Sequence, residues 1–257
     1  MVTKPYLQIP IVESGEALLP IPIDQFAHQT PHAYAALGAP YGEASPYFVR
    51  EQVLQALIKA QQVLQADKPH WQIFIFDAYR PVAVQEFMVN TAFQEALAQQ
   101  NLVKADLTAT QKEALWEQVL KIWALPSLDP KTPPPHSTGG AVDVTLYDRN
   151  AQSLIDMGSP IDEMSTRSQP HYFADLAQDS RLNEDERSAA QTAAHHRQIL
   201  LDAMSAAGFQ RHLGEWWHFC LGDQMWAWLT RQQSTGEESK GLTGIGASQA
   251  IAKYGRV

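Results

Sequence analysis

Gly214-Glu215-Trp216-Trp217-His218, near the C-terminal end of the chain, sets a carboxylate and an imidazole three positions apart with two indoles between them. Two adjacent tryptophans gain nothing from a solvated surface, so this segment is predicted to be at least half buried. A Glu and a His in such surroundings need partners, because an unpaired buried charge is costly. A metal ion satisfies both, with His218 as a ligand and Glu215 accepting a proton from water. The alternative is a core strand with an outward Glu215 and a hydrogen-bonded His218.

The backbone of this segment has to be irregular if both residues serve one site. Residues three apart in a regular strand point to opposite faces of the sheet. Glu215 and His218 can reach the same ion only if the chain bulges or turns between them. A break in the strand is therefore predicted at residues 216–217.

A second pair of candidate ligands lies in His136-Ser137-Thr138-Gly139-Gly140-Ala141-Val142-Asp143. From Ala141 onward polar and apolar residues alternate, which predicts a strand with Asp143 on one face and valines on the core face. In an unbroken strand His136 would point away from Asp143, but the two glycines between them permit a turn that re-aims the chain. His136 and Asp143 can then converge on one ion. The alternative is a loop histidine and an aspartate that caps a local turn.

A third group of polar residues follows the run Trp71-Gln72-Ile73-Phe74-Ile75-Phe76. This β-branched and aromatic run predicts a central strand that is covered on both faces. The chain continues as Asp77-Ala78-Tyr79-Arg80-Pro81, and Pro81 suits the first turn of a following helix. Asp77 and Arg80 are therefore expected at the tip of a buried strand, where side chains face a cleft. The alternative is a local Asp–Arg pair on the surface.

The remaining segments predict helices and strands in mixed order. Residues 6–12 predict a strand, residues 24–46 a long loop that could cover a site, and residues 209–220 a final pair of strands. Apolar residues at helical spacing predict helices at 48–66, from 81 onward, at 110–123 and from 183 to about 208. Capping boxes are expected at Thr110 with Glu113 and at Asn183 with Glu186. Residues from 234 onward are rich in Gly, Ser and Thr and predict a loosely attached tail.

Composition narrows the class of protein and the chemistry of the site. The 257 residues are 45% hydrophobic and 18% charged, as in ordinary soluble globular proteins. A net charge of -9 argues against nucleic acid or an anionic membrane as a partner. Cys220 is the only cysteine, so an internal disulfide and a cysteine-based zinc site are both excluded. The N-terminal residues lack an export signal and no apolar run could span a membrane, which predicts a cytoplasmic protein.

Taken together, these segments supply the parts of a catalytic metal site. Two histidines and one carboxylate, from His136, Asp143 and His218, leave a coordination position open on a tetrahedral zinc ion. Glu215 supplies a general base, and Arg80 supplies a fixed cation that can stabilise an oxyanion. The joint occurrence of these residues favours catalysis over the local alternatives.

Three blocks of the sequence resemble the signature blocks of the zinc D-alanyl-D-alanine dipeptidases. They are residues 76–81, residues 136–146 and Glu215-Trp216-Trp217-His218, and residues 157–162 and 167–168 also match. The family includes the vancomycin-resistance dipeptidase and belongs with the D,D-carboxypeptidases and the Hedgehog-like zinc fold. The resemblance implies an α+β fold with a central, mostly antiparallel sheet flanked by helices. It implies a single zinc-peptidase domain at residues 1–233, followed by a C-terminal tail at residues 234–257.

The resemblance also implies roles for individual residues. One zinc ion per chain would be bound by three ligands: His136, Asp143 and His218. Glu215 would be the general base, and Arg80 would contact the carbonyl oxygen of the substrate. Asp162 would hold the free amino group of a D-Ala-D-Ala dipeptide. Asp77 and Tyr79 are expected to belong to the substrate-binding site as well. Asp77 could orient Arg80 through a charge-assisted pair.

Two other functions remain open at this point. The same chemistry could serve a D,D-carboxypeptidase that trims peptidoglycan stem peptides, although the predicted cytoplasmic location disfavours a substrate outside the cell. The chain could also be a zinc-stabilised binding module without catalysis, but such a module needs neither Glu215 nor Arg80. The sequence departs from the family pattern at Pro134-Pro135 and at Thr138, and it matches poorly over residues 24–42. We expect these differences to affect which substrate side chains the enzyme accepts, and not the catalytic residues. The expected partner is a small dipeptide, with no nucleic acid and no membrane.

Overall fold

The computed structural model describes residues 4–238 and 250–257. In this part of the chain the main sheet has six strands in the order β2-β4-β5-β8-β7, with β6 paired to β5. The strands are β2 (Ala27–His28), β4 (Trp71–Asp77), β5 (Ala141–Asp148), β6 (Ser153–Leu154), β7 (Gln210–Arg211) and β8 (His218–Cys220). All pairings are antiparallel except that of β2 with β4, so the predicted mostly antiparallel sheet is confirmed.

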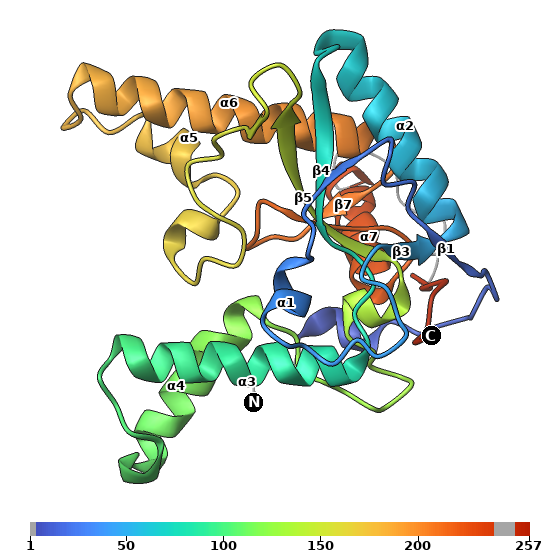
Figure 1. Cartoon of the computed structure of the whole chain (residues 1–257), viewed down its shortest axis with the longest axis vertical. Helices are drawn as coiled ribbons and strands as arrows, with labels where there is room; N and C mark the ends of the chain where they lie inside the picture. The colour runs from blue at the N-terminus through green and yellow to red at the C-terminus, as the bar shows by residue number, and fades with distance from the viewer. Residues whose placement is uncertain (1–3, 239–249) are drawn as a thin grey trace.

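Helices flank this sheet and a small second sheet lies beside it (Figure 1). The helices are α1 (Ala33–Ala36), α2 (Glu51–Asp67), α3 (Val82–Gln99), α4 (Ala109–Ile122), α5 (Tyr172–Leu176), α6 (Glu184–Ala206) and α7 (Gln224–Glu238). The second sheet pairs β1 (Leu18–Pro20) with β3 (Phe48–Arg50). Short 3₁₀ helices are η1 (Pro5–Gln8), η2 (Lys104–Asp106), η3 (Pro135–Thr138) and η4 (Thr166–Ser168). Of the helices described, none has the length and apolar character needed to cross a lipid bilayer.

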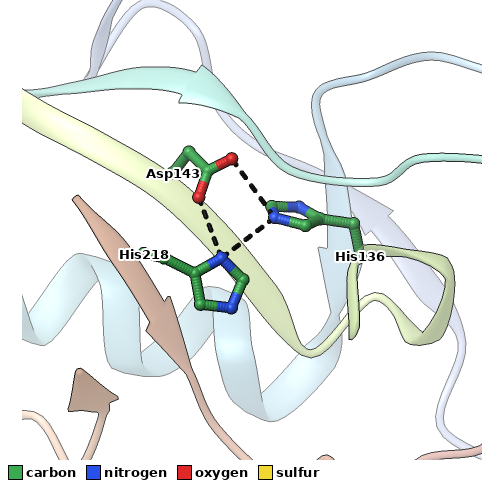
Figure 2. Close-up of side chains that lie close together, drawn as sticks. All are labelled: His136, Asp143 and His218. Carbon is green, nitrogen blue, oxygen red and sulfur yellow. Dashed lines mark hydrogen bonds and ion pairs between the residues drawn. The ribbon is translucent and has the colours of Figure 1, made fainter. Parts of the chain in front are cut away.

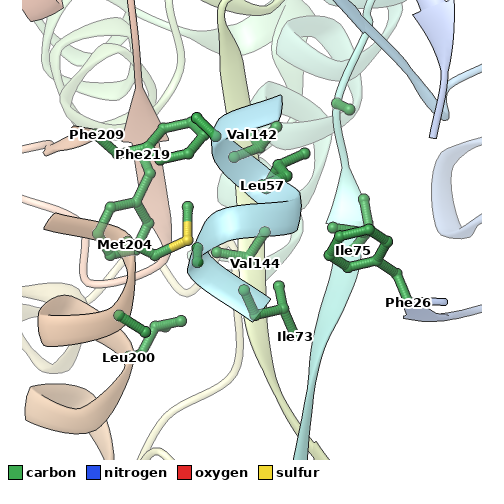
Figure 3. Packing of buried hydrophobic residues seen from close by; sticks show 14 of the residues in the cluster. Phe26, Leu57, Ile73, Ile75, Val142, Val144, Leu200, Met204, Phe209 and Phe219 are labelled. Atoms are coloured by element: carbon green, nitrogen blue, oxygen red, sulfur yellow. The ribbon is translucent and has the colours of Figure 1, made fainter. Parts of the chain in front are cut away.

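The main core lies between the sheet and the pair α2 and α6, which pack against each other (Figure 3). Apolar residues at helical spacing on both helices meet the apolar faces of β4 and β5, as amphipathic helices require. The core includes Leu57, Ile73, Ile75, Val142, Val144, Leu200 and Met204. A second cluster forms between α3 and α4 and includes Tyr34 of α1. The prediction of a central strand at residues 71–76 is confirmed.

The register of the central strands brings polar residues together at one end of the sheet. Asp77 of β4 lies opposite Asp143 of β5, after a register shift between Ile75 and Asp77. On its other side Asp143 lies opposite His218 of β8. Three polar residues from distant parts of the sequence are thus neighbours across three strands.

Several predicted element boundaries are wrong for local reasons. Residues 6–12 do not form a strand: Pro5 starts η1, and only an isolated parallel bridge from Ile11 to Ala252 follows. Residues 48–50 form β3, so α2 begins at Glu51. The capping box of α4 uses Thr108 with Gln111, two positions before the predicted pair, because the Thr108 hydroxyl accepts the Gln111 N–H. The capping box at Asn183 is confirmed.

The last described residues pack firmly against the body of the protein. Ala252 and Tyr254 are fully buried, and the Lys253 N–H donates to the Gly222 carbonyl at 2.7 Å. Gly222 has φ +81, and a Cβ there would collide with the Tyr254 ring. Loose attachment is therefore wrong for residues 250–257, while residues 239–249 lie outside the described part. The division of the chain at residue 233 stays a prediction.

Replacing Tyr254 by Ala should destabilise the protein by about 3–5 kcal/mol, because it empties a fully buried site in the main core. Tyr254→Phe keeps the ring and removes only the hydroxyl that donates to Glu16 at 3.0 Å. It should cost about 0.5–1.5 kcal/mol. Urea unfolding of the two variants measures the difference. Equal and negligible costs would show that this segment does not belong to the core.

Candidate active site

Three buried side chains converge at the end of the central strands: His136, Asp143 and His218 (Figure 2). His136 Nε2 lies 3.2 Å from Asp143 Oδ2, and His218 Nδ1 lies 3.0 Å from Asp143 Oδ1. The two histidine nitrogens are 3.2 Å apart. None of the three residues is more than 5% exposed. The predicted convergence of these residues is therefore present in the fold.

The backbone places His136 beside the strands through a turn at the glycine pair. His136 lies in η3, and Gly139 ends this helix in the left-handed conformation with φ 72. A side chain at Gly139 would also collide with Leu18. The turn lets the chain enter β5 at Ala141 with Asp143 facing back toward His136. The predicted role of the glycine pair is confirmed.

The donor set fits a divalent metal ion. The Ala78 carbonyl can only accept, so His136 Nδ1, 2.7 Å away, carries the hydrogen and Nε2 is left free as a ligand. Atoms bound to one tetrahedral zinc ion at about 2.0–2.1 Å lie roughly 3.3 Å apart, close to the distances seen here. Burial favours a neutral Asp143, but the adjacent imidazoles of His136 and His218 hold the pKa of that carboxyl well below its usual value. The ligand group is thus an ionised carboxylate with two imidazoles.

Glu215 lies beside this group because the chain is irregular immediately before β8. Trp216 donates its N–H to the Ser168 carbonyl, and the backbone bends at residues 216–217, so the strand begins only at His218. The predicted break at residues 216–217 is confirmed. Glu215 is 5% exposed and lines one cavity with all three candidate ligands. Burial raises the pKa of Glu215 well above its usual value, and Asp143 adds to the rise.

Arg80 is buried on the other side of the ligand group and is held rigidly. Its Nε and Nη2 donate to Asp77 Oδ2 at 2.9 and 2.7 Å, and its Nη1 donates to Gln85 at 2.8 Å. The guanidinium also lies over the rings of Tyr34 and Trp123. Burial alone would lower the pKa of Arg80, but the Asp77 carboxylate raises it, so the guanidinium stays charged. The expected Asp77–Arg80 pair is present.

Asp77 is itself fixed by residues of the segment predicted as a covering loop. His32 Nε2 lies 3.1 Å from Asp77 Oδ1, and the Tyr41 hydroxyl donates to the same oxygen at 3.2 Å. His32 and Tyr41 are both buried. The sequence did not predict that these two residues belong to the site. The one local indication was a histidine, His32, next to Pro31 in a loop that could cover a site.

Asp162 also lines the cavity, whereas Tyr79 does not. Asp162 has φ 66 and accepts a 2.7 Å hydrogen bond from the Tyr34 hydroxyl. Burial raises the pKa of Asp162 to about 7, and the Asp143 carboxylate contributes. Tyr79 is half-buried, and burial raises its pKa while Arg256 and Arg50 act in the opposite direction. The structure brings every predicted site residue together except Tyr79.

A buried arginine links the loop of Asp162 to the segment of Glu215. Arg197 of α6 donates to the carbonyls of Met157, Arg167 and Gln169 and to the Ser159 hydroxyl, each at 2.8–2.9 Å. The Trp216 indole donates to the same hydroxyl at 3.0 Å. The sequence predicted only a helix here, because an arginine that binds carbonyls carries no local pattern.

Comparison with known proteins agrees with this geometry. A family model described as D-ala-D-ala dipeptidase matches residues 27–236. The chain belongs to this family. A D-alanyl-D-alanine dipeptidase of Synechocystis sp. is 45% identical over 254 residues, which cover 99% of this chain and 97% of that protein. The D-alanyl-D-alanine dipeptidase of Enterococcus faecium is 27% identical over 173 residues, 67% of this chain and 72% of that protein.

Family membership confirms the resemblance from which the α+β fold was expected. The described part of this dipeptidase-family chain holds a buried His-Asp-His group able to bind a metal. The roles of the individual residues stay predictions.

Replacing His136, Asp143 or His218 by Ala should in each case lower bound zinc well below one ion per chain, because each removes one of three ligands. Metal analysis of purified variants by mass spectrometry measures this. His195→Ala is the matched control, since His195 is an exposed histidine of α6 outside the group. Full zinc content in two of the three ligand variants would contradict the assignment.

Proposed function

We propose that this chain is a zinc-dependent dipeptidase that hydrolyses D-Ala-D-Ala and related D,D-dipeptides. One observation carries the proposal: Glu215, Arg80 and Asp162 line the same cavity as the His-Asp-His group. The name of the Synechocystis relative, which matches nearly the whole chain, supports the choice of substrate. A cytoplasmic location and a role in cell-wall metabolism stay predictions.

One zinc ion per chain, held by His136, Asp143 and His218, would supply Lewis acidity and lower the pKa of water at the site toward about 7. Glu215 then accepts the proton of the attacking water and returns it to the leaving amine. Its elevated pKa fits a group that must hold this proton between the two steps. Its burial also keeps bulk water from competing for the proton.

Arg80 stabilises the negative charge that develops on the carbonyl oxygen of the scissile peptide. Asp77 and Gln85 hold its guanidinium in one orientation before substrate arrives, so little reorganisation is needed during the reaction. Asp77, with no exposed surface, acts through Arg80 rather than on the substrate itself. A purely structural metal site would need neither a buried cation such as Arg80 nor a buried proton acceptor such as Glu215. The presence of both therefore supports catalysis.

Asp162 binds the free amino group of the dipeptide. Its carboxyl group lines the cavity and is oriented by Tyr34. A carboxypeptidase acting on longer stem peptides would have to place a neutral peptide group against this side chain. The position of Asp162 therefore favours the dipeptidase over that alternative. A substrate contact for Tyr79 stays a prediction without support from its position.

Glu215→Gln should bind zinc as the parent does and lose at least about 100-fold in kcat. Glutamine keeps the size of the side chain but cannot accept the proton, and general-base assistance is typically worth 10²–10⁴-fold. Hydrolysis of D-Ala-D-Ala is measured together with metal content. Loss of zinc from this variant would mean that Glu215 is a ligand, and an unchanged kcat would mean that another group is the base.

Asp162→Asn should raise KM for D-Ala-D-Ala, because the ammonium group of the dipeptide loses its carboxylate partner. Hydrogen bonds between charged groups are worth enough that a rise of roughly 10-fold or more is expected. N-acetyl-D-Ala-D-Ala lacks the ammonium group, so its already poor hydrolysis should change little. A parent that preferred the acetylated or a longer peptide would support the carboxypeptidase alternative instead.

A further inference from the structure

The catalytic cavity adjoins a second and much larger cavity. Their volumes are about 30 Å³ and about 630 Å³, and five residues line both: Lys4, Tyr6, Trp123, Ala124 and Pro135. The smaller cavity has room for roughly two water molecules, so part of a bound dipeptide must extend beyond it. The larger cavity is mainly apolar, with Trp116, Leu120 and Pro134 in its wall. The shared residues mark the direction in which the substrate extends.

Among the described residues, Lys4 is the one cation that lines both cavities. Arg80 lines the smaller one and Lys121 the larger one. Within residues 4–238 and 250–257, the side-chain amine of Lys4 makes no ion pair at contact distance; burial lowers its pKa, and the Glu215 carboxylate acts in the opposite direction. Its backbone is anchored, since its carbonyl accepts from Leu7 in η1, and Gln224 of α7 in turn donates to the Ile9 carbonyl after η1. Lys4 thus lines the junction of the two cavities on an anchored backbone.

A dipeptide brings two charges to the site, and only one has an assigned partner so far. Asp162 suits the amino group, but the carboxylate needs a cation. Arg80 cannot bind the carboxylate through two N–H groups at once, because its Nε and Nη2 already donate to Asp77 and its Nη1 donates to Gln85. Pro134 and Pro135 have no N–H to donate. In the part of the chain that the structure describes, Lys4 is the other lysine or arginine that lines the catalytic cavity.

The order of charges along the cavity agrees with the chemistry. Glu215 returns its proton to the leaving amine, and this amine belongs to the C-terminal residue of the substrate. The C-terminal residue must therefore lie on the side of Glu215. Lys4 and Asp162 line the same cavity as Glu215, and Asp162 accepts a hydrogen bond from the Tyr34 hydroxyl. The cavity thus offers a cation for the carboxylate end of the dipeptide and a carboxylate for its amino end.

We propose that the ammonium group of Lys4 binds the α-carboxylate of the dipeptide, and that this contact selects substrates with a free C-terminus. The inference rests on the proposed dipeptidase function and assigns it a specificity-determining residue. In this arrangement Lys4 holds the C-terminal residue of the substrate, which contains the leaving amine, at the junction of the two cavities. The side chain of that substrate residue would then lie next to the apolar cavity.

The test compares D-Ala-D-Ala with D-alanyl-D-alaninamide, which lacks the negative charge. Lys4→Met should lower kcat/KM for the free acid by roughly 10–100-fold, mainly through KM, as expected for loss of a hydrogen bond between charged groups. For the amide it should change kcat/KM by less than about 2-fold. Lys4→Arg should keep most of the preference for the acid. Lys121→Met, which alters the larger cavity alone, should behave as the parent does.

The outcomes separate the two proposals. Equal losses on acid and amide in Lys4→Met would mean that Lys4 acts only through Glu215, and this would overturn the inference while the dipeptidase function stands. If Lys121→Met lost the preference for the free acid over the amide as much as Lys4→Met does, the net charge of the site and not a contact with Lys4 would select the acid. That result would also overturn the inference and leave the dipeptidase function standing. A zinc-loaded parent that hydrolyses neither compound would overturn the proposed function itself.

Discussion

The antiparallel pairing of β5 with β4 on one side and β8 on the other is the constraint on which the site depends. Asp143 of β5 lies opposite Asp77 of β4 on one side and opposite His218 of β8 on the other, so β5 brings residues of three strands together. Side chains alternate along a strand, and a slip of one residue would send Asp143 into the core. Val142 and Val144, which are fully buried on the other face, oppose such a slip. Hydrophobic burial therefore fixes the position of the metal-binding carboxylate.

The same arrangement concentrates acidic groups where water is scarce. Burial raises the pKa of Glu215 and of Asp162; Asp143 adds to both rises, Asp162 adds to that of Glu215, and Asp77 adds to that of Asp162. Arg80 compensates Asp77 and in part Asp143. A divalent cation beside Asp143 would compensate more of this charge, because buried carboxylates are stable as ions only with a cation or several donors nearby. The chemistry of the site and its stability thus call for the same ion.

What the sequence predicted follows from local pattern, and what it missed follows from tertiary contact. His136, Asp143, Glu215 and His218 could be placed in one site because glycines, strand alternation and paired tryptophans leave local signals. Lys4, His32 and Arg197 could not, since each meets its neighbours only after segments far apart in the chain have packed. Loose attachment is wrong for residues 250–257 for a similar reason: composition predicted it, yet Tyr254 packs against Gly222.

The distribution of these residues along the chain also has a consequence for biosynthesis. His136 and Asp143 are translated long before His218, and residues 250–257 follow later still, with the Val257 N–H donating to the Ser137 carbonyl beside His136. A polypeptide that stops before His218 therefore lacks a complete ligand group. Contacts between residues so far apart in the chain slow folding, because loop closure costs entropy before the contact is made. A translation product truncated before residue 218 cannot assemble the three ligands.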